Sequence, residues 1–565
     1  MGVPTYFKGM FTRRKPNKSG STSVQVVVKT RDRRQRVVKS LGVGHTEHEL
    51  LELERQGQDY IDSLSGPMIP GLSETDSELE EYLSSIKNSQ IQIIGPELIF
   101  GTLYDRMGYS ALDNEMFRHL VVCRLYNPGS KLKTVDYLSG YLHVTCSVDR
   151  IYRFLDELCL RHEHKTGDCD NASQALCDGV DGKAISPGAS TAEREGTGLK
   201  EQVERITFAH TRQVVGGEIA VCFYDMTTLY FEAAEEDELR RYGFSKDGKN
   251  ACPQIVLGLL VAGGGNPIGY EIFEGNTVES KTLVPMIRAL AAKYGFDLPI
   301  VVADSGLLTR KNMEELTKEG YEYILGARPR NDTQAVKDKI LALNLSDGMV
   351  AEIAKENGIR LIVSCSDKRA RKDAYNRKRG LARLEKNIGS GRLTKQNINN
   401  RGYNKYLKLE GDVSISIDMD KFNKDAAWDG IKGYVTNTTL PASEIIEKYS
   451  NLWYIERAFR FNKSDLAVRP IYHRLKNRIE GHICICFTAY AILLELERIL
   501  KAGKSKLTVY AAQELTKNMY ALDCQLPKSK KHKKIILGMS SEQQELYALV
   551  SHASDSTGKK NVKDN

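Results

Sequence analysis

The sequence predicts an α/β protein whose central sheet mixes antiparallel and parallel strands. Its main evidence is a series of apolar runs of strand length, which are EIAVCFYDMTTLYF, QIVLGLLVAG and IGYEIFEG. The next such runs, PIVVAD and YEYILGA, alternate with the helical segments SKTLVPMIRALAAKY and TRKNMEELTKEG. Strands joined by short turns pair antiparallel, whereas strands joined across a helix pair parallel. We therefore expect one mixed sheet with flanking helices over residues 217–328.

The amino-terminal part, residues 1–77, is predicted to form a basic β-hairpin followed by a helix. The hairpin strands are SVQVVVK and RVVKSL, which the polar turn TRDRR separates. Thr46 and Glu49 have the spacing of a capping box, and helical apolar spacing continues from there to Leu64. Residues 66–77 (GPMIPGLSETDS) have the composition of a linker.

Residues 78–164 are predicted to be helical. Two stretches, LKTVDYLSGYL and SVDRIYRFLDELC, are separated by HVTC as in a helix-turn-helix motif. An ordinary helical bundle explains the same pattern equally well. Residues 165–205 are rich in Gly, Ser, Asp and Ala without periodicity, which predicts a flexible insertion.

The rest of the chain is predicted to hold one large domain and a tail. At 565 residues the protein is too long for one core, so three or four structural units are expected. The large domain would span residues 206–500. A basic and then strand-rich insertion, residues 331–440, would interrupt it before helical signals return. Residues 501–565 would form a basic carboxy-terminal tail.

Basic residues are clustered along the chain, although the net charge is only +8. Residues 1–40 contain eleven Lys or Arg and one acid, and residues 367–408 contain fourteen against three. A further run, KSKKHKK, lies at residues 528–534. Such patches suit a polyanion, so the amino-terminal hairpin within residues 1–77 and the segment 368–408 are expected to hold terminal inverted repeats or flanking DNA. Residues 78–164 are expected to bind DNA through the helix-turn-helix pattern. A solvated charged surface is the alternative.

Cysteine usage and hydropathy indicate a cytoplasmic protein. The eleven cysteines form no C-x-x-C pair, and several lie in apolar runs such as HICICF, which fits a reducing compartment. No apolar stretch reaches the roughly 18 residues that a membrane span requires, and no apolar signal core follows Met1. We therefore expect no membrane partner.

Two acids stand at the ends of predicted strands. Asp225 is the only charged residue between Glu218 and Glu232, and Asp304 closes the apolar run PIVVA. Burying an ionised carboxylate without compensation costs several kcal/mol or more. A functional role for Asp225 competes with an alternative in which it caps the turn after its strand. For Asp304 the alternative is a cap on the next helix, but Thr309 is better placed to cap that helix.

A third acid, Glu456, lies in a predicted helix. At about 100° per residue, Tyr449, Leu452, Glu456 and Lys463 fall on one narrow stripe, with Arg460 beside it. Such a stripe would present one metal ligand flanked by phosphate donors. A solvated helix face has a similar appearance, but the apolar neighbours of Glu456 favour a helix packed on a core.

These segments resemble insertion-sequence DDE transposases of the IS-four-like class. YSNLWYIERAFRFNKSDL is similar to their signature Y-x2-R-x3-E-x6-K, and VVADSGLLTRKNMEEL and YDMTTLYFE resemble the surroundings of their first two aspartates. The resemblance covers about residues 217–500, and the strand order matches a ribonuclease-H-like core. Leu452 stands where the signature has Arg, so Arg457 or Arg460 would have to supply that contact.

The resemblance implies a DNA transposase that cuts element ends and joins the freed 3′-hydroxyl to target DNA. Asp225, Asp304 and Glu456 would be its catalytic and metal-binding residues. Mg²⁺ is the expected ion and Mn²⁺ a plausible substitute, because an all-carboxylate site is hard. The expected partners are double-stranded DNA, at terminal inverted repeats and target, and a second copy of the chain in the DNA complex.

Side chains expected to contact DNA come from two regions. The Glu456 helix would contribute Tyr449, Arg457, Arg460 and Lys463, and the basic insertion would contribute Arg369, Arg371 and Lys372. Trp428 is a candidate platform for an unstacked base, with burial in a core as the competing interpretation. Two other functions remain open, a silent or domesticated DNA-binding repressor and a nuclease of the same fold that does not join ends.

Overall fold

The computed structural model describes residues 10–558, apart from residues 19, 30–33, 64–79, 81, 88–89, 141, 160–197, 233–234, 246–247, 249–250, 296–297, 392, 394–396, 400–401, 411–413, 467, 470 and 526–530. The linker predicted at 66–77 and most of the insertion predicted at 165–205 lie outside the described residues. The chain divides into two compact units, Met1–Gln92 with Ala521–Ile536, and Ile93–Tyr520 with Leu537–Asn565. None of the described helices has the length and apolar character that crossing a membrane requires.

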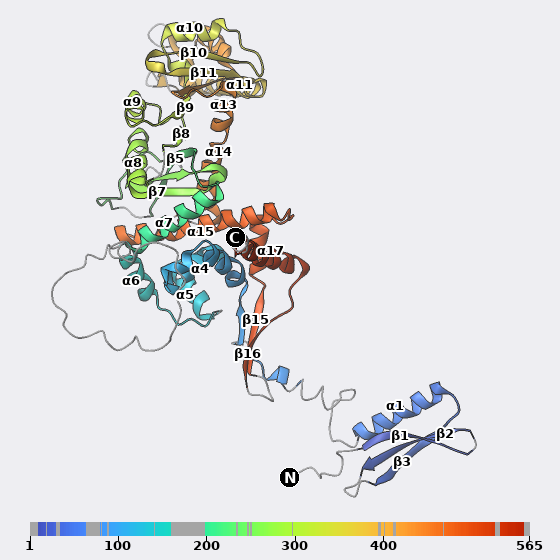
Figure 1. The fold of residues 1–565 in the computed structure, drawn as a ribbon. Helices are drawn as coiled ribbons and strands as arrows, with labels where there is room; N and C mark the ends of the chain where they lie inside the picture. Colours follow the sequence, from blue (N-terminus) through green and yellow to red (C-terminus); the bar gives the residue numbers. More distant parts are fainter. Residues whose placement is uncertain are drawn as a thin grey trace, which may run out of the picture. The chain divides into compact units, whose positions relative to one another are not determined.

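In the amino-terminal unit, a three-stranded antiparallel sheet stands where the sequence predicts a hairpin (Figure 1). Its strands, in spatial order, are β1 (Met10–Pro16), β2 (Thr22–Lys29) and β3 (Gln35–Gly44). α1 (Glu47–Ser63) packs on them. The backbone N–H of Glu49 donates to Thr46 Oγ1 at 3.3 Å, as the capping pattern requires. β1 was not predicted because MFTRRKP lacks an apolar run.

A small sheet with the order β16-β15-β4 joins segments far apart in the sequence. β4 spans Ile91–Ile93, β15 spans Tyr520–Gln525 and β16 spans His532–Ile536. The sequence predicts a basic tail here, and the structure shows that part of this tail is an antiparallel hairpin in which Gln525 pairs with His532.

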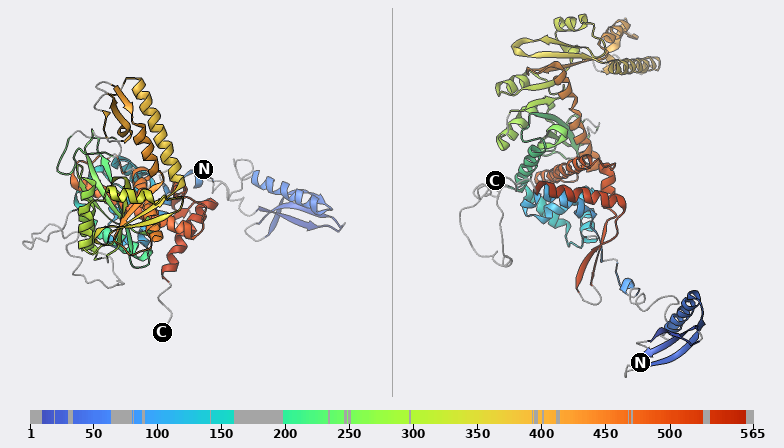
Figure 2. Two further views of the ribbon diagram at one scale, coloured as in Figure 1. Left: turned by 90° about the horizontal axis from the view of Figure 1, so that it is seen from above. Right: turned by 45° about the vertical axis from the view of Figure 1, so that its right-hand side comes forward.

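The larger unit is built on an eight-stranded mixed sheet with the order β10-β11-β14-β9-β8-β5-β6-β7 (Figures 1 and 2). β5, β6 and β7 pair antiparallel, while β8 and β9 run parallel to β5. β14, β11 and β10 then continue the sheet antiparallel from β9. The strand bounds are β5 Val221–Tyr230, β6 Gln254–Val261, β7 Pro267–Glu274, β8 Ile300–Ala303, β9 Tyr323–Ala327, β10 Val350–Ala354, β11 Arg360–Cys365 and β14 Ile431–Thr436.

Both faces of this sheet are covered, because its strands alternate apolar side chains between two cores. In β8, Val301 and Ala303 belong to one core and Val302 to the other. The core of Val301 includes side chains of α8 (Leu283–Tyr294), α9 (Arg310–Lys318) and α10 (Gln334–Ala342). The core of Val302 includes α13 (Ala442–Ser450), α14 (Trp453–Arg460) and α15 (Lys476–Ala502).

A helical bundle surrounds α15, the long buried helix of the larger unit (Figure 1). Ile151, Leu155 and Leu158 of α6 are buried in the core that α15 shares. The helices predicted as a helix-turn-helix pair, α5 and α6, are therefore members of this bundle. The bundle and its surroundings comprise η2 Glu97–Gly101, α3 Thr102–Arg106, η3 Tyr109–Leu112, α4 Glu115–Tyr126, α5 Lys131–Gly140, α6 Val148–Leu158, α7 Leu199–Val214, α16 Val509–Thr516 and α17 Ser541–Gly558.

The predicted insertion, residues 331–440, contributes β10, β11 and β14 to the main sheet. Its basic segment forms one long helix, α11 (Asp367–Gly389), which Figure 2 shows along its length in the left view. The hairpin of β12 (Leu407–Glu410) and β13 (Ser414–Ile417) and the short helix α12 (Met419–Lys424) follow it. The sequence predicts strands in this region, but not that they extend the central sheet.

A buried ion-pair cluster ties three helices of the bundle together. Glu495 of α15 has a side chain only 1% exposed, and it accepts hydrogen bonds from Arg498 at 2.7 Å. Arg106 of α3 and His210 of α7 lie 3.5 and 3.4 Å from it. Burial opposes ionisation of Glu495, but the bonds from Arg498 and His210 outweigh burial and lower its pKa to about 2.

We predict that this cluster stabilises the fold mainly above about pH 5. The pKa of Glu495 is lower in the folded protein than the ordinary 4.5, so its contribution is lost as pH falls toward about 2. Glu495→Gln should therefore destabilise the protein most near neutral pH. The gap in free energy of unfolding from the unsubstituted protein should narrow by about 3 kcal/mol between about pH 5 and pH 2. Thermal unfolding across that range measures it, and a gap independent of pH would contradict the assignment.

Candidate active site

The register of two parallel strands brings Asp225 and Asp304 to one level of the sheet. Tyr224 of β5 is the partner of Ala303 of β8. Asp225 and Asp304 directly follow these two residues, so their carboxylates leave neighbouring strands side by side. Because side chains alternate along a strand, Asp225 shares the face of Phe223, on which α14 packs.

Asp304 is exposed and held by two donors. The backbone N–H of Ser305 donates to Asp304 Oδ1 at 2.6 Å, and the hydroxyl of Tyr449 donates to the same oxygen at 3.3 Å. Gly326 of β9 makes this approach possible, because an added Cβ would overlap the Tyr449 hydroxyl. A residue without a side chain is therefore required beside the acid.

Glu456 lies on α14 with its side chain exposed. The helix packs on β5 and β6 through Ile455, Ala458 and Phe459, which are buried. Tyr454, two residues before Glu456, makes an edge contact with Phe223, whose ring centroid is 6.2 Å away. Glu456 is thus carried by a helix fixed against the strand that carries Asp225.

The charges of Asp304 and Glu456 act on the same neighbours. Burial raises the pKa of Tyr449, and both carboxylates raise it further. Burial and Arg369 lower the pKa of Lys432, while Asp304 and Glu456 oppose that shift. Lys432 lies on β14, and its ammonium is 4.5 Å from the centroid of the Tyr449 ring. No sequence pattern points to Lys432, because only sheet pairing brings β14 to this place.

The donor set fits a hard divalent cation, since it consists of carboxylates on neighbouring rigid elements. Among the residues that the structure describes, however, no three side chains of His, Cys, Asp or Glu are placed closely enough to hold one ion together. Asp304 and Glu456 are the exposed members of the predicted triad, and Asp225 is half-buried.

The predicted catalytic helix is not continuous. α13 ends at Ser450, α14 begins at Trp453, and a π turn, η12 (Phe461–Asp465), follows α14. The expectation of one regular helix from Tyr449 to Lys463 is therefore wrong. Tyr449 reaches Asp304 from the preceding helix, and Lys463 lies in the π turn.

The arginines predicted as substitutes for the missing signature Arg are placed differently. Leu452, at the signature position, is buried with 8% exposure. Arg457 forms an ion pair with Glu497 of α15 and lies over the rings of Trp453 and Phe461. Arg460 is exposed and lines a cavity of about 510 Å³, together with Arg457, Glu497, Lys501 and Tyr510.

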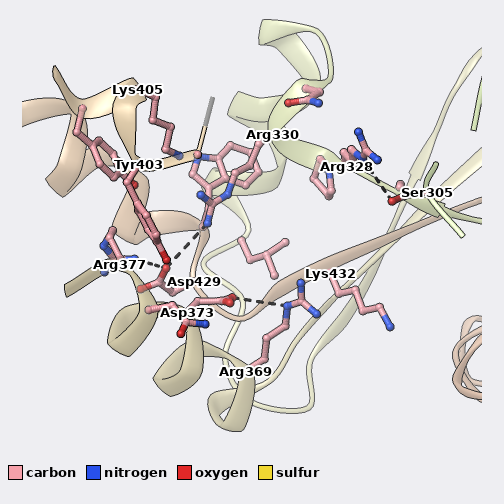
Figure 3. A pocket seen from close by; sticks show the side chains of 18 residues that line it. Ser305, Arg328, Arg330, Arg369, Asp373, Arg377, Tyr403, Lys405, Asp429 and Lys432 are labelled. Atoms are coloured by element: carbon pink, nitrogen blue, oxygen red, sulfur yellow. Dashed lines mark hydrogen bonds and ion pairs between the residues drawn. The ribbon is translucent and has the colours of Figure 1, made fainter. Parts of the chain in front are cut away.

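A basic pocket of about 580 Å³ lies beside Ser305, the residue after Asp304 (Figure 3). Trp428 forms part of its wall with 9% exposure and also belongs to the core beneath the sheet. Arg369 lines the pocket, 3.6 Å from Asp373, while Arg371 and Lys372 lie exposed on α11. The remaining cations around the pocket, which the sequence did not single out, are Arg328, Arg330, Arg377, Lys405 and Lys432.

Comparison with solved structures finds transposases. The piggyBac transposase, in a synaptic complex with hairpin DNA, is similar over 83% of this chain and 82% of that chain, at 10% identity and a TM-score of 0.35. The Mos1 transposase, in a paired-end complex with its left transposon end, is similar over 48% and 71%, at 12% identity and a TM-score of 0.14. Among curated proteins, none matches it.

A family model provides the decisive comparison. Residues 217–492 match the model of the transposase DDE domain. The match begins just before β5 and ends within α15, so it includes Asp225, Asp304 and Glu456 together with the strands and helices that carry them. Residues 217–492 therefore form a transposase DDE domain, and the protein is a DNA transposase, an enzyme that breaks and rejoins phosphodiester bonds.

Proposed function

We propose that Asp225, Asp304 and Glu456 are the catalytic carboxylates of this transposase and the ligands of its divalent metal. The main support is the pairing register of β5 and β8, which places Asp225 and Asp304 next to each other on neighbouring strands. α14, which carries Glu456, packs on β5. The strand order β7-β6-β5-β8-β9, antiparallel and then parallel, supports a ribonuclease-H-like core.

We propose Mg²⁺ as the physiological ion and Mn²⁺ as a substitute, because all three ligands are hard oxygen donors. When bound, such ions activate the attacking oxygen and stabilise the leaving oxygen of an in-line displacement at phosphorus. Asp304 and Glu456 are exposed, so rotation of their side chains would let both carboxylates hold an ion. Tyr449 and Ser305 both bond Asp304 Oδ1, which orients the carboxylate and leaves Oδ2 for a ligand.

The reaction needs no nucleophilic side chain. A water oxygen attacks the phosphorus at the element end, the bond from phosphorus to the 3′ oxygen breaks, and the 3′ oxygen takes up a proton. The freed 3′-hydroxyl then attacks a phosphorus of the target and loses its proton, while the bond from that phosphorus to the target 3′ oxygen breaks and the departing 3′ oxygen takes up a proton. By holding the ions, the three carboxylates would let both steps take place at one position.

We further propose that the chain is a variant of the IS-four-like class, in which Leu452 replaces the signature Arg. Tyr449 and Glu456 stand at the matching signature positions. Tyr449 donates to Asp304, and the charge of Glu456 acts on both Tyr449 and Lys432. Lys463 completes the signature in sequence, although a π turn carries it. We propose that the protein acts on terminal inverted repeats. It would do so as a homodimer, because two element ends must be held together. We also propose that the reaction takes place in the cytoplasm.

The basic helix α11 is the surface that we propose for DNA beyond the reacting bond. Arg371 and Lys372 are exposed on it, and Arg369 connects it to the pocket beside Ser305. Cations of this kind position a duplex through its phosphates. Arg457 is less suited to this role, because its guanidinium is engaged in an ion pair with Glu497.

The first prediction concerns cleavage and joining of a supercoiled plasmid that carries the gene with its own flanking DNA. With Mg²⁺, the protein should nick the plasmid and produce joined products. Asp304→Asn should abolish both activities, because the substitution removes a metal-binding charge without changing side-chain size. Gel separation of nicked, linear and joined DNA measures the outcome.

Asp420→Asn is the matched control, because Asp420 is exposed on α12 and was not placed in the site. It should cut and join like the unsubstituted protein. Cleavage by a folded Asp304→Asn protein at the normal rate would refute the carboxylate assignment. Cleavage without joined products would instead identify a nuclease that does not transpose.

The second prediction concerns α11. Replacing Arg371 and Lys372 with Ala should reduce the slope of log affinity against log salt by about 2, because each phosphate contact contributes about 0.9. Arg310 and Lys311 provide the matched control, since both are exposed on α9 and paired with Glu314 and Glu315. Their replacement should leave the slope unchanged. Titration of a fluorescent duplex at several salt concentrations measures it, and equal slopes for both double variants would exclude α11 as a phosphate contact.

A further inference from the structure

Lys432 occupies an unusual position for a lysine. It is the second residue of β14, between Ile431 and the buried Gly433, in the middle of an eight-stranded sheet. Its ammonium lies 4.5 Å from the centroid of the Tyr449 ring and 5.2 Å from that of the Tyr434 ring. These two rings contact each other edge to face at 4.8 Å. The aromatic pair thus holds the ammonium in place by cation–π attraction.

The charges around Lys432 are those of the candidate active site. Asp304 and Glu456 are the acids that act on it, and Arg369 is the neighbouring cation. Tyr449, the ring beneath the ammonium, donates its hydroxyl to Asp304. In Figure 3 the Lys432 side chain points away from the Arg377–Asp429 pair. Within the described part of the chain, no carboxylate forms an ion pair with Lys432, so its N–H groups are available to a ligand.

The catalytic helix itself does not supply a cation at the signature position. Leu452 is buried there among apolar neighbours. Arg457 is engaged in an ion pair with Glu497, which Lys501 also contacts, and Arg460 faces the separate cavity shared with Lys501 and Tyr510. A phosphodiester approaching three carboxylates is repelled, and a partly desolvated cation beside them offsets that repulsion strongly.

We propose that Lys432 binds the phosphate under attack, and that β14 thereby supplies the cation that position 452 lacks. This inference rests on the proposed role of Asp225, Asp304 and Glu456. The ammonium donates to a non-bridging oxygen of the scissile phosphate, while the aromatic pair keeps it from collapsing onto Asp304. The ligand is one phosphodiester of the DNA strand, and the residue contributes both to placing it and to stabilising charge in the transition state.

The first test compares single-turnover cleavage of a duplex copied from the DNA that flanks the gene. Lys432→Met should cleave on the order of 100-fold more slowly, as expected for loss of one donor to a developing charge. Lys432→Arg should stay within about tenfold of the unsubstituted rate, because it keeps the cation. Lys318→Met, at an exposed position on α9, is the matched control and should cleave normally. If thermal unfolding shows that Lys432→Met does not fold, Lys432→Gln replaces it.

The second test separates a phosphate contact from a structural role. Binding is measured without metal to the same duplex with either a normal phosphate or an uncharged methylphosphonate at the cleavage position. The unsubstituted protein should bind the normal duplex about tenfold more tightly than Lys432→Met, and the two should bind the methylphosphonate duplex equally. Persistence of the tenfold difference with the methylphosphonate would overturn the proposal, because the loss would not depend on the phosphate charge.

The Asp304→Asn protein separates failure of the Lys432 proposal from failure of the carboxylate assignment. Loss of cleavage by Asp304→Asn together with normal cleavage by Lys432→Met would overturn the role of Lys432 and leave the carboxylate assignment standing. Normal cleavage by Asp304→Asn would overturn both. Loss in both variants, with recovery in Lys432→Arg, supports the proposal.

Discussion

The parallel pairing of β5 with β8 is the constraint on which the rest of the site depends. It is set by backbone hydrogen bonds deep in the sheet, where Cys222 and Val301 are partners and both are completely buried. A slip of one residue would turn Asp225 to the opposite face, toward the core of α8. Two apolar cores, one on each face, therefore fix the position of a polar group that contributes nothing to either core.

The other parts of the site are attached to this sheet from far along the chain. α13 and α14 deliver Tyr449 and Glu456 across the core that contains Val302. β14 delivers Lys432 because the insertion returns to pair with β9, with Gly433 opposite Ala327. Close approach at Gly326 then allows Tyr449 to contact the acid. Segments separated by more than two hundred residues thus meet through sheet pairing and helix packing, not through local geometry.

The two acids were predictable because a lone charge in an apolar run is visible in the sequence, but only Asp304 follows the end of its strand, since Asp225 lies within β5. Asp225 and Asp304 each have that pattern. The short turn between β6 and β7 predicts their antiparallel pairing, and the helix between β8 and β9 predicts their parallel pairing. The break between α13 and α14 was not predictable, since NLW contains neither Gly nor Pro and the apolar stripe continues across it. The position of Lys432 in the site was also not predictable, because pairing between strands far apart in the sequence produces no periodic sequence pattern. β1 was not predicted for a different reason, because its sequence is mostly polar.

Because β14 continues the central sheet, the insertion at residues 331–440 is a structural part of that sheet. β9 is paired on one side with β8 and on the other with β14. Excising residues 331–440 would leave the backbone N–H and C=O groups that β9 directs toward β14 unpaired along an apolar strand edge. Such an edge recruits strands from other molecules, so a trimmed enzyme would tend to aggregate. The segment 331–440, which the sequence predicts as an insertion, therefore also covers the edge of β9 and prevents other molecules from pairing with it.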